Sequence, residues 1–196
     1  MNRIKEVIAN SISVKQAVLA DESLLSIVEQ VANVITEAFR NDKKVLFCGN
    51  GGSAADAQHL AAEFSGRFYF DRDPLFSEAL HVNTSYITAV ANDYSYEQIY
   101  SRLIKAKGRE GDVLVGLSTS GNSKNVVRAF EQGKENGMII VAMTGEGGGL
   151  MKEAADYLID IPSKDTPRIQ ECHMMLGHII CELVEAALFQ PSAVSQ

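Results

Sequence analysis

Residues 112–123 read DVLVGLSTSGNS, a continuous apolar run that passes directly into a run of hydroxyl-bearing side chains. An uninterrupted apolar run is typical of a strand that is buried on both faces of a parallel sheet. Residues 44–53 repeat the pattern, because KVLFC is followed by GNGGS. Each polar loop opens a predicted helix, so both stretches predict a buried strand, a ligand-facing loop and a helix.

The rest of the chain continues this alternation. Apolar runs at residues 138–143 and 157–161 predict two further strands, and residues 78–82 predict a weaker one. Helices are expected over residues 53–65, 85–91, 96–106, 123–136, 149–155 and 167–188. Strand and helix alternation of this kind implies right-handed crossovers. We therefore predict a doubly wound, three-layer α/β sandwich around a parallel sheet.

The first forty or so residues differ, because their apolar positions recur at three- and four-residue steps typical of helices. A break at residues 20–23 is expected to separate two helices, with Asp21 or Ser23 as the N-cap of the second. We expect a helical arm over residues 1–41 and an α/β core over residues 42–196, together forming one domain. Such an arm suits an oligomer contact and equally suits packing on its own domain.

Composition excludes several classes of function. A formal net charge of -7 argues against a broad nucleic-acid interface, which needs a basic face. The cysteines, Cys48, Cys172 and Cys181, are odd in number and lack CxxC spacing, which disfavours a disulfide framework and suits a reducing cytosol. No apolar run approaches the roughly 20 residues that span a bilayer. We expect a cytoplasmic protein that binds neither nucleic acid nor membranes.

The two polar loops are the expected ligand site, because ligands of such sheets bind beyond the carboxyl ends of the strands. Their glycines permit close backbone approach, and helix N-termini and hydroxyls donate hydrogen bonds to anions. A phosphate monoester suits this environment. Neither loop matches a dinucleotide or nucleoside triphosphate motif. The plain alternatives are a tight turn for the first loop and helix capping for the second.

Two helices carry candidate catalytic side chains. His59 and Glu63 lie four residues apart and share a face of the helix that follows the first loop. The last helix carries Gln170, Glu171, His173 and His178. Histidines, a carboxylate and an amide can bind zinc or transfer protons only if the fold brings the two helices together. The alternative for His59 and Glu63 is a surface ion pair, and His81 and His173 are expected to be structural or surface residues.

Five motifs occur in an order that closely resembles bacterial phosphoheptose isomerases, which belong to the sugar isomerase (SIS) domain class. They are CGNGGSAADAQHLAAEFSGRF, VANDYSYEQIYSR, GREGDVLVGLSTSGNSKNVV, TGEGGGLM and RIQECHMMLGHIICELVE, and they cover nearly the whole chain. The resemblance implies a five-stranded parallel sheet of flavodoxin-like or Rossmann-like type, assembled as a homotetramer with active sites at subunit interfaces. It also implies conversion of D-sedoheptulose 7-phosphate to D-glycero-D-manno-heptose 7-phosphate through a cis-enediol, the first step toward ADP-heptose and the lipopolysaccharide core.

The resemblance further implies the roles of single residues, and no position departs from the family pattern. Glu63 matches the catalytic base and His178 the acid. Substrate contacts match Asn50, Gly51, Gly52, Ser53, Glu63, Asn92, Asp93, Ser118, Thr119, Ser120, Ser123 and Gln170. One zinc ion per subunit, where the family binds it, matches His59, Glu63, Gln170 and His178.

Two other functions remain as alternatives. A sister group of the family associates with the bacterial replication initiator without known isomerase activity, and resembles this chain in length and at Leu188 and Phe189. That group loses the carboxylate at the position of Glu63 and alters the Ser-Thr-Ser-Gly loop, whereas this chain retains both. Phosphosugar-sensing regulators usually add a helix-turn-helix domain, for which the first forty residues are too short and insufficiently basic. The isomerase is therefore favoured.

Overall fold

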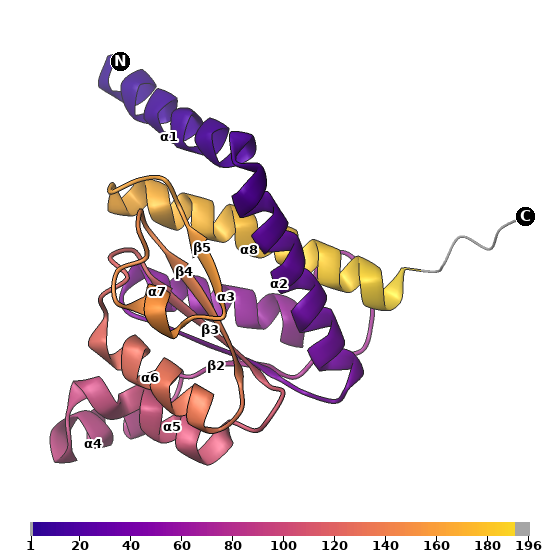
Figure 1. Ribbon diagram of the computed structural model, residues 1–196, viewed down its shortest axis with the longest axis vertical. Coiled ribbons are helices and arrows are strands. Elements are labelled where there is room, and N and C mark those ends of the chain that lie inside the picture. Colours follow the sequence, from indigo (N-terminus) through magenta and orange to yellow (C-terminus); the bar gives the residue numbers. More distant parts are fainter. Residues whose placement is uncertain (1, 191–196) are drawn as a thin grey trace, which may run out of the picture.

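The computed structural model describes residues 2–190, and a five-stranded parallel sheet forms its centre (Figure 1). The strands are β1 (Val45–Gly49), β2 (Ser77–Ala79), β3 (Val113–Ser118), β4 (Ile139–Thr144) and β5 (Tyr157–Asp160). They are ordered β2-β1-β3-β4-β5 in the sheet. The predicted α/β fold with a parallel sheet is confirmed. Met1 and residues 191–196 of the predicted domain lie outside the described residues.

Helices cover both faces of this sheet. They are α1 (Asn2–Ala20), α2 (Glu22–Arg40), α3 (Gly52–Ser65), α4 (Thr84–Asp93), α5 (Ile99–Lys107), α6 (Lys124–Glu135), α7 (Met151–Ala154) and α8 (Thr166–Phe189), with a 3₁₀ turn η1 (Tyr96–Gln98) before α5. The apolar core divides in two: Phe47 and Val115 face α2, α3 and α8, whereas Leu46 and Leu114 face α4 to α7. Because neighbouring strand residues point to opposite faces, both core halves need apolar side chains. This explains the continuous apolar runs of β1 and β3.

Two elements differ from the expectation. The weak strand expected at residues 78–82 is observed as β2, which pairs with β1 over three residues before Leu80 and His81 turn away. The helix expected at residues 149–155 is only the short α7. Gly147, Gly148 and Gly149 have φ values of 85°, 78° and 54°. A positive φ is incompatible with a right-handed helix, so this glycine run delays the start of α7.

The helix α8 is long and apolar enough to cross a membrane by length and composition alone. This differs from the expectation that no apolar run is long enough to span a bilayer. The difference arises because α8 packs against α2, α3 and the sheet, so apolar side chains occupy more than one of its faces. A Cβ atom at Gly177 would lie 2.6 Å from the Leu60 side chain. The missing side chain therefore lets α8 approach α3 closely, as a helix of the folded core.

The two N-terminal helices behave differently. Asp21 caps α2 by accepting a hydrogen bond from the Leu24 N–H at 3.0 Å, which confirms one of the two expected caps. The apolar face of α2 is buried in the core, whereas α1 buries only Val18 and projects from the body (Figure 1). A polar contact attaches α1 to α8, because the Ser11 hydroxyl donates to Glu171 Oε2 at 2.6 Å.

Candidate active site

The two polar loops follow neighbouring strands, β1 and β3, and a network of amides joins them. Asn50 Nδ2 donates to Asn125 Oδ1 at 2.9 Å, and Asn125 Nδ2 donates to Asn50 Oδ1 at 2.8 Å. The Tyr96 hydroxyl also donates to Asn50 Oδ1 at 2.9 Å. Asn125 is not among the site residues predicted from the sequence, although a polar residue in the first turn of an otherwise apolar-faced helix was a usable signal. The network fixes the first loop against the start of α6.

Hydroxyl groups converge within the second loop. The Ser118 and Ser123 Oγ atoms lie 2.8 Å apart, and the Ser118 and Ser120 Oγ atoms lie 3.4 Å apart. Ser123 is the N-cap residue of α6, but its side chain makes no capping hydrogen bond. Capping by Ser123 therefore does not account for these hydroxyls. Three neutral donors at the N-terminus of a helix form an arrangement suited to a phosphate group.

The glycine-rich segment between β4 and α7, residues 145–149, packs against the backbone of the second loop. Gly121 has a φ of 64°, and a Cβ atom there would overlap the carbonyl oxygen of Gly148. The Met151 N–H donates to the Gly121 carbonyl at 2.9 Å, and the Gly145 N–H donates to the Thr119 carbonyl at 3.1 Å. The conformation of the loop thus depends on close backbone contact with a segment that follows β4.

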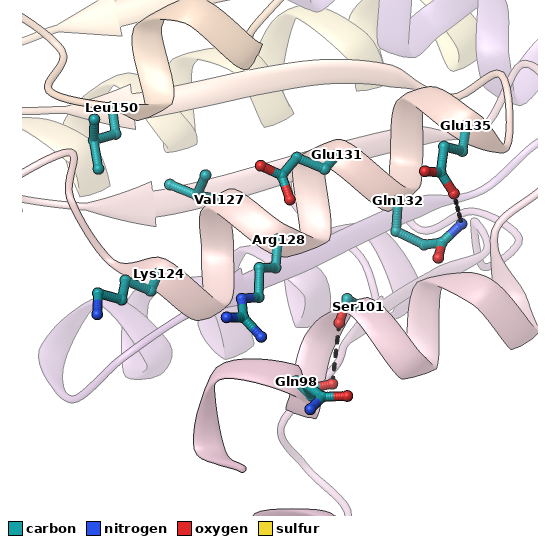
Figure 2. Close-up of a pocket in the computed structure, with 9 residues that line it drawn as sticks. All are labelled: Gln98, Ser101, Lys124, Val127, Arg128, Glu131, Gln132, Glu135 and Leu150. Atoms are coloured by element: carbon teal, nitrogen blue, oxygen red, sulfur yellow. Dashed lines mark hydrogen bonds between the residues drawn. The ribbon is translucent and has the colours of Figure 1, made fainter. Parts of the chain in front are cut away.

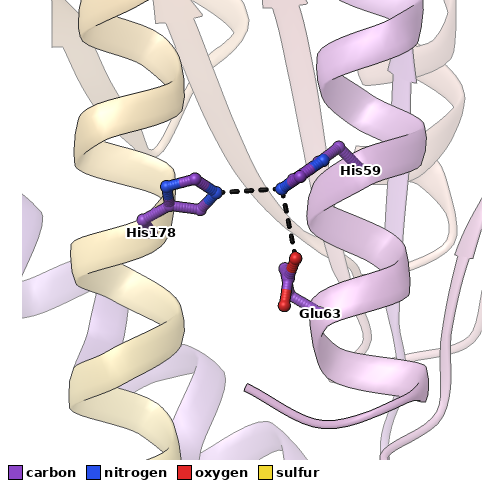
Figure 3. Close-up of side chains that lie close together, drawn as sticks. All are labelled: His59, Glu63 and His178. Carbon is purple, nitrogen blue, oxygen red and sulfur yellow. Dashed lines mark hydrogen bonds and ion pairs between the residues drawn. The ribbon is translucent and has the colours of Figure 1, made fainter. Parts of the chain in front are cut away.

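The fold brings His59, Glu63 and His178 together between α3 and α8 (Figure 3). His59 Nε2 lies 2.9 Å from His178 Nε2 and 3.1 Å from Glu63 Oε1. The side chain of His59 is 50% exposed and that of Glu63 is 23% exposed, so the group is open to solvent on one side. Because His59 also contacts His178, His59 and Glu63 are not an isolated surface ion pair.

This group has the composition and spacing of a metal site. Each of the three side chains offers one ligand atom, and these atoms lie within 4.8 Å of one another. Donor atoms about 2.0–2.1 Å from a tetrahedral zinc ion stand roughly 3.3 Å apart. His59 Nε2 lies close to this distance from His178 Nε2 and from Glu63 Oε1, at 2.9 and 3.1 Å. Two imidazole nitrogens and one carboxylate oxygen leave a fourth position open. The three residues can therefore hold a metal ion.

Gln170, on α8, contacts the first loop. A Cβ atom at Gly52 would overlap the Gln170 side-chain amide, so Gln170 packs directly over the first loop. It precedes His178 by eight residues on α8, which places its backbone about 12 Å along the helix axis from that of His178. Its contact with the loop is observed, whereas its role as a metal ligand stays a prediction.

A second carboxyl group lies beside the histidines. Asp56 is on α3 between the first loop and His59, and its Oδ2 atom is buried without a hydrogen-bond partner among the described residues. Burial raises the pKa of Asp56 to about 6, although the nearby His59 lowers it. Burial therefore favours the neutral form of the Asp56 carboxyl group.

Asn92 and Asp93 occupy the last turn of α4. Both are exposed, and Asn92 Nδ2 donates to Asp93 Oδ1 at 2.9 Å. They precede Tyr96 by a few residues, and Tyr96 binds Asn50 of the first loop. Their expected contact with substrate stays a prediction.

In contrast, His173 is fully buried, and its Nε2 atom lies 3.0 Å from the Thr144 carbonyl oxygen, which indicates a structural role.

A groove of about 580 Å³ lies elsewhere, beside α5 and α6 (Figure 2). Its lining residues are Gln98, Ser101, Lys124, Val127, Arg128, Glu131, Gln132, Glu135 and Leu150. Both cations of this set are already paired, because Lys124 and Arg128 contact Glu97 at 3.3 and 2.6 Å. The remaining charges are carboxylates, so the groove suits a phosphate less well than the two loops.

Comparison with known proteins places the chain among phosphosugar enzymes. Residues 8–145 match the family model described as the SIS domain. The phosphoheptose isomerase of Aneurinibacillus thermoaerophilus is 56% identical over 98% of this chain and 97% of its own length. That of Burkholderia pseudomallei strain K96243 is 52% identical over 96% and 98%. The structure of phosphoheptose isomerase from Neisseria gonorrhoeae superposes with a TM-score of 0.89 at 41% identity, covering 94% and 98% of the two chains.

Proposed function

This chain belongs to the SIS-domain family of phosphoheptose isomerases, and we propose that it converts D-sedoheptulose 7-phosphate to D-glycero-D-manno-heptose 7-phosphate. The observation that carries the proposal is the meeting of Glu63 and His178, with Glu63 on the helix α3 that follows the first polar loop. The initiator-binding alternative is not favoured, because the relatives are named as isomerases and both features that the sister group loses are present.

The substrate phosphate binds at the second loop, where Ser118, Ser120 and Ser123 present hydroxyls at the start of α6. The sugar then extends toward α8. His59 and Glu63 lie about 10 to 16 Å further along the α3 axis than Gly52, which leaves room for an extended chain between phosphate and reacting carbons. Further contacts are proposed for Asn50, Gly51, Gly52, Ser53, Asn92, Asp93, Thr119 and Gln170. Binding energy at the remote phosphate holds the reacting carbons in register.

Two proton transfers convert the ketose to the aldose. Glu63 removes a proton from C1 while His178 donates a proton to the oxygen on C2, which gives the cis-enediol. Glu63 then returns a proton to C2, and His178 takes the proton from the oxygen on C1, which leaves the aldehyde. Protons and electrons balance without a redox partner. The partial exposure of Glu63 leaves it accessible to the sugar.

We also propose that His59, Glu63 and His178 hold one zinc ion per subunit, with Gln170 as a fourth ligand. A bound zinc ion would act as a Lewis acid that polarises the substrate carbonyl. His59 contacts both Glu63 and His178, so it orients these two side chains.

Zinc binding is expected at a ratio of one ion per chain. His59→Ala should abolish it, because the proposed site loses one of its two imidazole ligands. His81→Ala is the matched control and should retain full zinc content, since His81 is outside the three-residue group. Metal analysis after dialysis, together with the rise in Tm on zinc addition, measures this. Equal zinc content in the two variants would contradict the proposed ligand set.

Incubation with sedoheptulose 7-phosphate, with and without a chelator, tests the proposed reaction. The aldose product should appear with intact protein, and its stereochemistry identifies the heptose formed. The chelator arm shows whether the metal is needed for turnover. No conversion in either arm, including with zinc added back, would reject the isomerase function and favour a binding role.

We propose a homotetramer in which the arm contacts other copies. Ile4, Ile8 and Ile12 form an apolar stripe on α1 with exposed fractions of 65%, 54% and 50%. Apolar side chains of α1 and α8 also line a cavity of about 330 Å³ between the two helices. Contiguous exposed apolar surface of this kind marks a protein contact. Active sites at subunit interfaces fit the open side of the His59 group.

Ile8→Glu is expected to dissociate the tetramer, because a buried carboxylate without a partner is costly. Asn10→Glu is the control, since Asn10 lies about 200° around α1 from Ile8 and the added charge is the same. Light scattering after size exclusion gives the mass of each variant. A tetramer that survives Ile8→Glu would place the interface elsewhere.

We propose that residues 1–196 form one SIS domain with residues 1–41 as its arm, acting in the cytoplasm on the path to ADP-heptose. Three observations support these assignments. The net charge is -7, Cys48, Cys172 and Cys181 are free and buried, and α2 packs into the same core as the sheet. We propose accordingly that the protein acts on a small-molecule substrate and binds neither nucleic acid nor membranes.

A further inference from the structure

A buried ion pair joins the segment after α3 to α8. The Arg72 and Glu185 side chains are 2% and 1% exposed, and Arg72 Nε donates to Glu185 Oε1 at 2.8 Å. Glu185 also accepts hydrogen bonds from three consecutive backbone N–H groups, those of Phe68 at 3.0 Å, Tyr69 at 2.6 Å and Phe70 at 3.0 Å. A single carboxylate on α8 thus determines the conformation of residues 66–72, which we call the strap.

The Arg72 guanidinium extends this contact to the end of α3. Nη1 donates to the carbonyls of Phe64 at 2.9 Å and Gly66 at 3.1 Å, and Nη2 donates to the carbonyl of Glu63 at 2.9 Å. The last carbonyls of a helix lack partners within the helix, and Arg72 satisfies them here. The backbone of Glu63 is therefore held directly by Arg72.

The other side of the site is held through α8 and the strap. Glu185 follows His178 by seven residues, about two helical turns, so the two side chains share a face of α8. The strap places the ring of Phe68 with its centroid 5.8 Å from that of His178, at an interplanar angle of 39°. The ion pair consequently contacts the backbone of the base and orders the aromatic neighbour of the acid.

We propose that Arg72 and Glu185 are positioning residues, which set the separation of Glu63 and His178 during isomerisation. Net stability alone is a poor explanation for the pair, because replacing a buried ion pair by apolar residues is often neutral or stabilising. Its bonds instead converge on the backbone of the base and on the strap. This inference rests on the isomerase function proposed above.

Glu185→Gln tests the proposal in the full-length protein. The amide keeps the volume but removes the charge and directs an NH₂ group at backbone donors, so the strap should loosen. We expect kcat to fall about 10- to 100-fold because small displacements of catalytic groups are costly, with KM nearly unchanged because the phosphate loops are untouched. Hydrogen exchange at the Phe68, Tyr69 and Phe70 amides should accelerate in the same variant.

Glu78→Gln is the matched control. Glu78 pairs with Lys107 at 2.7 Å on the edge strand β2, so this substitution removes an ion pair of similar length away from the strap. It should leave kcat and strap exchange at wild-type values. Turnover by the wild type in the same assay keeps the two proposals separable, since its absence would reject the isomerase itself.

Unchanged kcat in a Glu185→Gln protein whose strap amides exchange freely would overturn the positioning role. So would a loss of activity that follows only the fraction of unfolded protein. If Glu185→Gln does not fold, Arg72→Lys replaces it in the same measurements. Lysine keeps the charge but lacks the planar fork that reaches several carbonyls, so kcat should again fall while KM holds.

Discussion

Glu63→Gln is expected to lower kcat by about 10²- to 10⁴-fold, the usual contribution of a general base. Glutamine has nearly the same shape as glutamate but cannot accept a proton at neutral pH. The phosphate loops lie outside the substitution, so substrate binding should remain close to that of the wild type. Steady-state kinetics gives kcat, and calorimetric titration with sedoheptulose 7-phosphate gives the affinity.

Solvent exchange distinguishes loss of the base from loss of a metal ligand. In deuterated water the wild type should incorporate deuterium into the sugar through the enediol, and Glu63→Gln should not, even when its zinc content is restored. Glu182→Gln, an exposed carboxylate on α8, serves as the control and should behave as the wild type. Turnover at the wild-type rate in Glu63→Gln would eliminate Glu63 as the base.

Gly121→Ala is expected to destabilise the protein by about 2–5 kcal/mol and to raise KM. The destabilisation combines about 1–2 kcal/mol for a left-handed residue with about 1–3 kcal/mol for overpacking against Gly148. Displacing even one hydrogen bond to a charged phosphate, worth about 1.5–3 kcal/mol, should raise KM roughly ten- to hundredfold. Denaturant unfolding and steady-state kinetics measure the two effects.

Gly147→Ala separates backbone strain from steric contact. Gly147 also has a positive φ, of 85°, but nothing lies within 4 Å of a Cβ atom there. Its cost should be only about 1–2 kcal/mol, with KM unchanged. Equal effects of the two substitutions would mean that the contact between Gly121 and Gly148 does not shape the phosphate loop.

Much of the fold was readable in the sequence because its elements are local. The buried runs of β1 and β3 must be apolar on both faces, and the polar loops that follow them mark the binding edge of a parallel sheet. The difference between the expected helix at residues 149–155 and the shorter α7 also has a local cause. Positive φ at Gly147, Gly148 and Gly149 delayed α7, and no periodicity rule reports that.

The candidate site likewise combines residues that are close in the sequence with one that is distant. The spacing of His59 and Glu63 placed both on one helical face, whereas the sequence could not say whether His178, more than a hundred residues later, joins them. The resemblance to the family motifs implies that the three residues act together. The physical reason for the meeting is the packing of α8 on α3, which Gly177 permits by leaving space for Leu60.

By itself, the sequence determined the alternation of strands and helices and the two polar loops, and its resemblance to the family implied which residues act as acid and base. Only the tertiary structure decided that the Ser118, Ser120 and Ser123 hydroxyls converge rather than cap α6. It also decided that Arg72 binds both Glu185 and the Glu63 carbonyl, next to the proposed catalytic pair. Local patterns record which face a residue occupies, but contacts between distant segments depend on how whole helices pack.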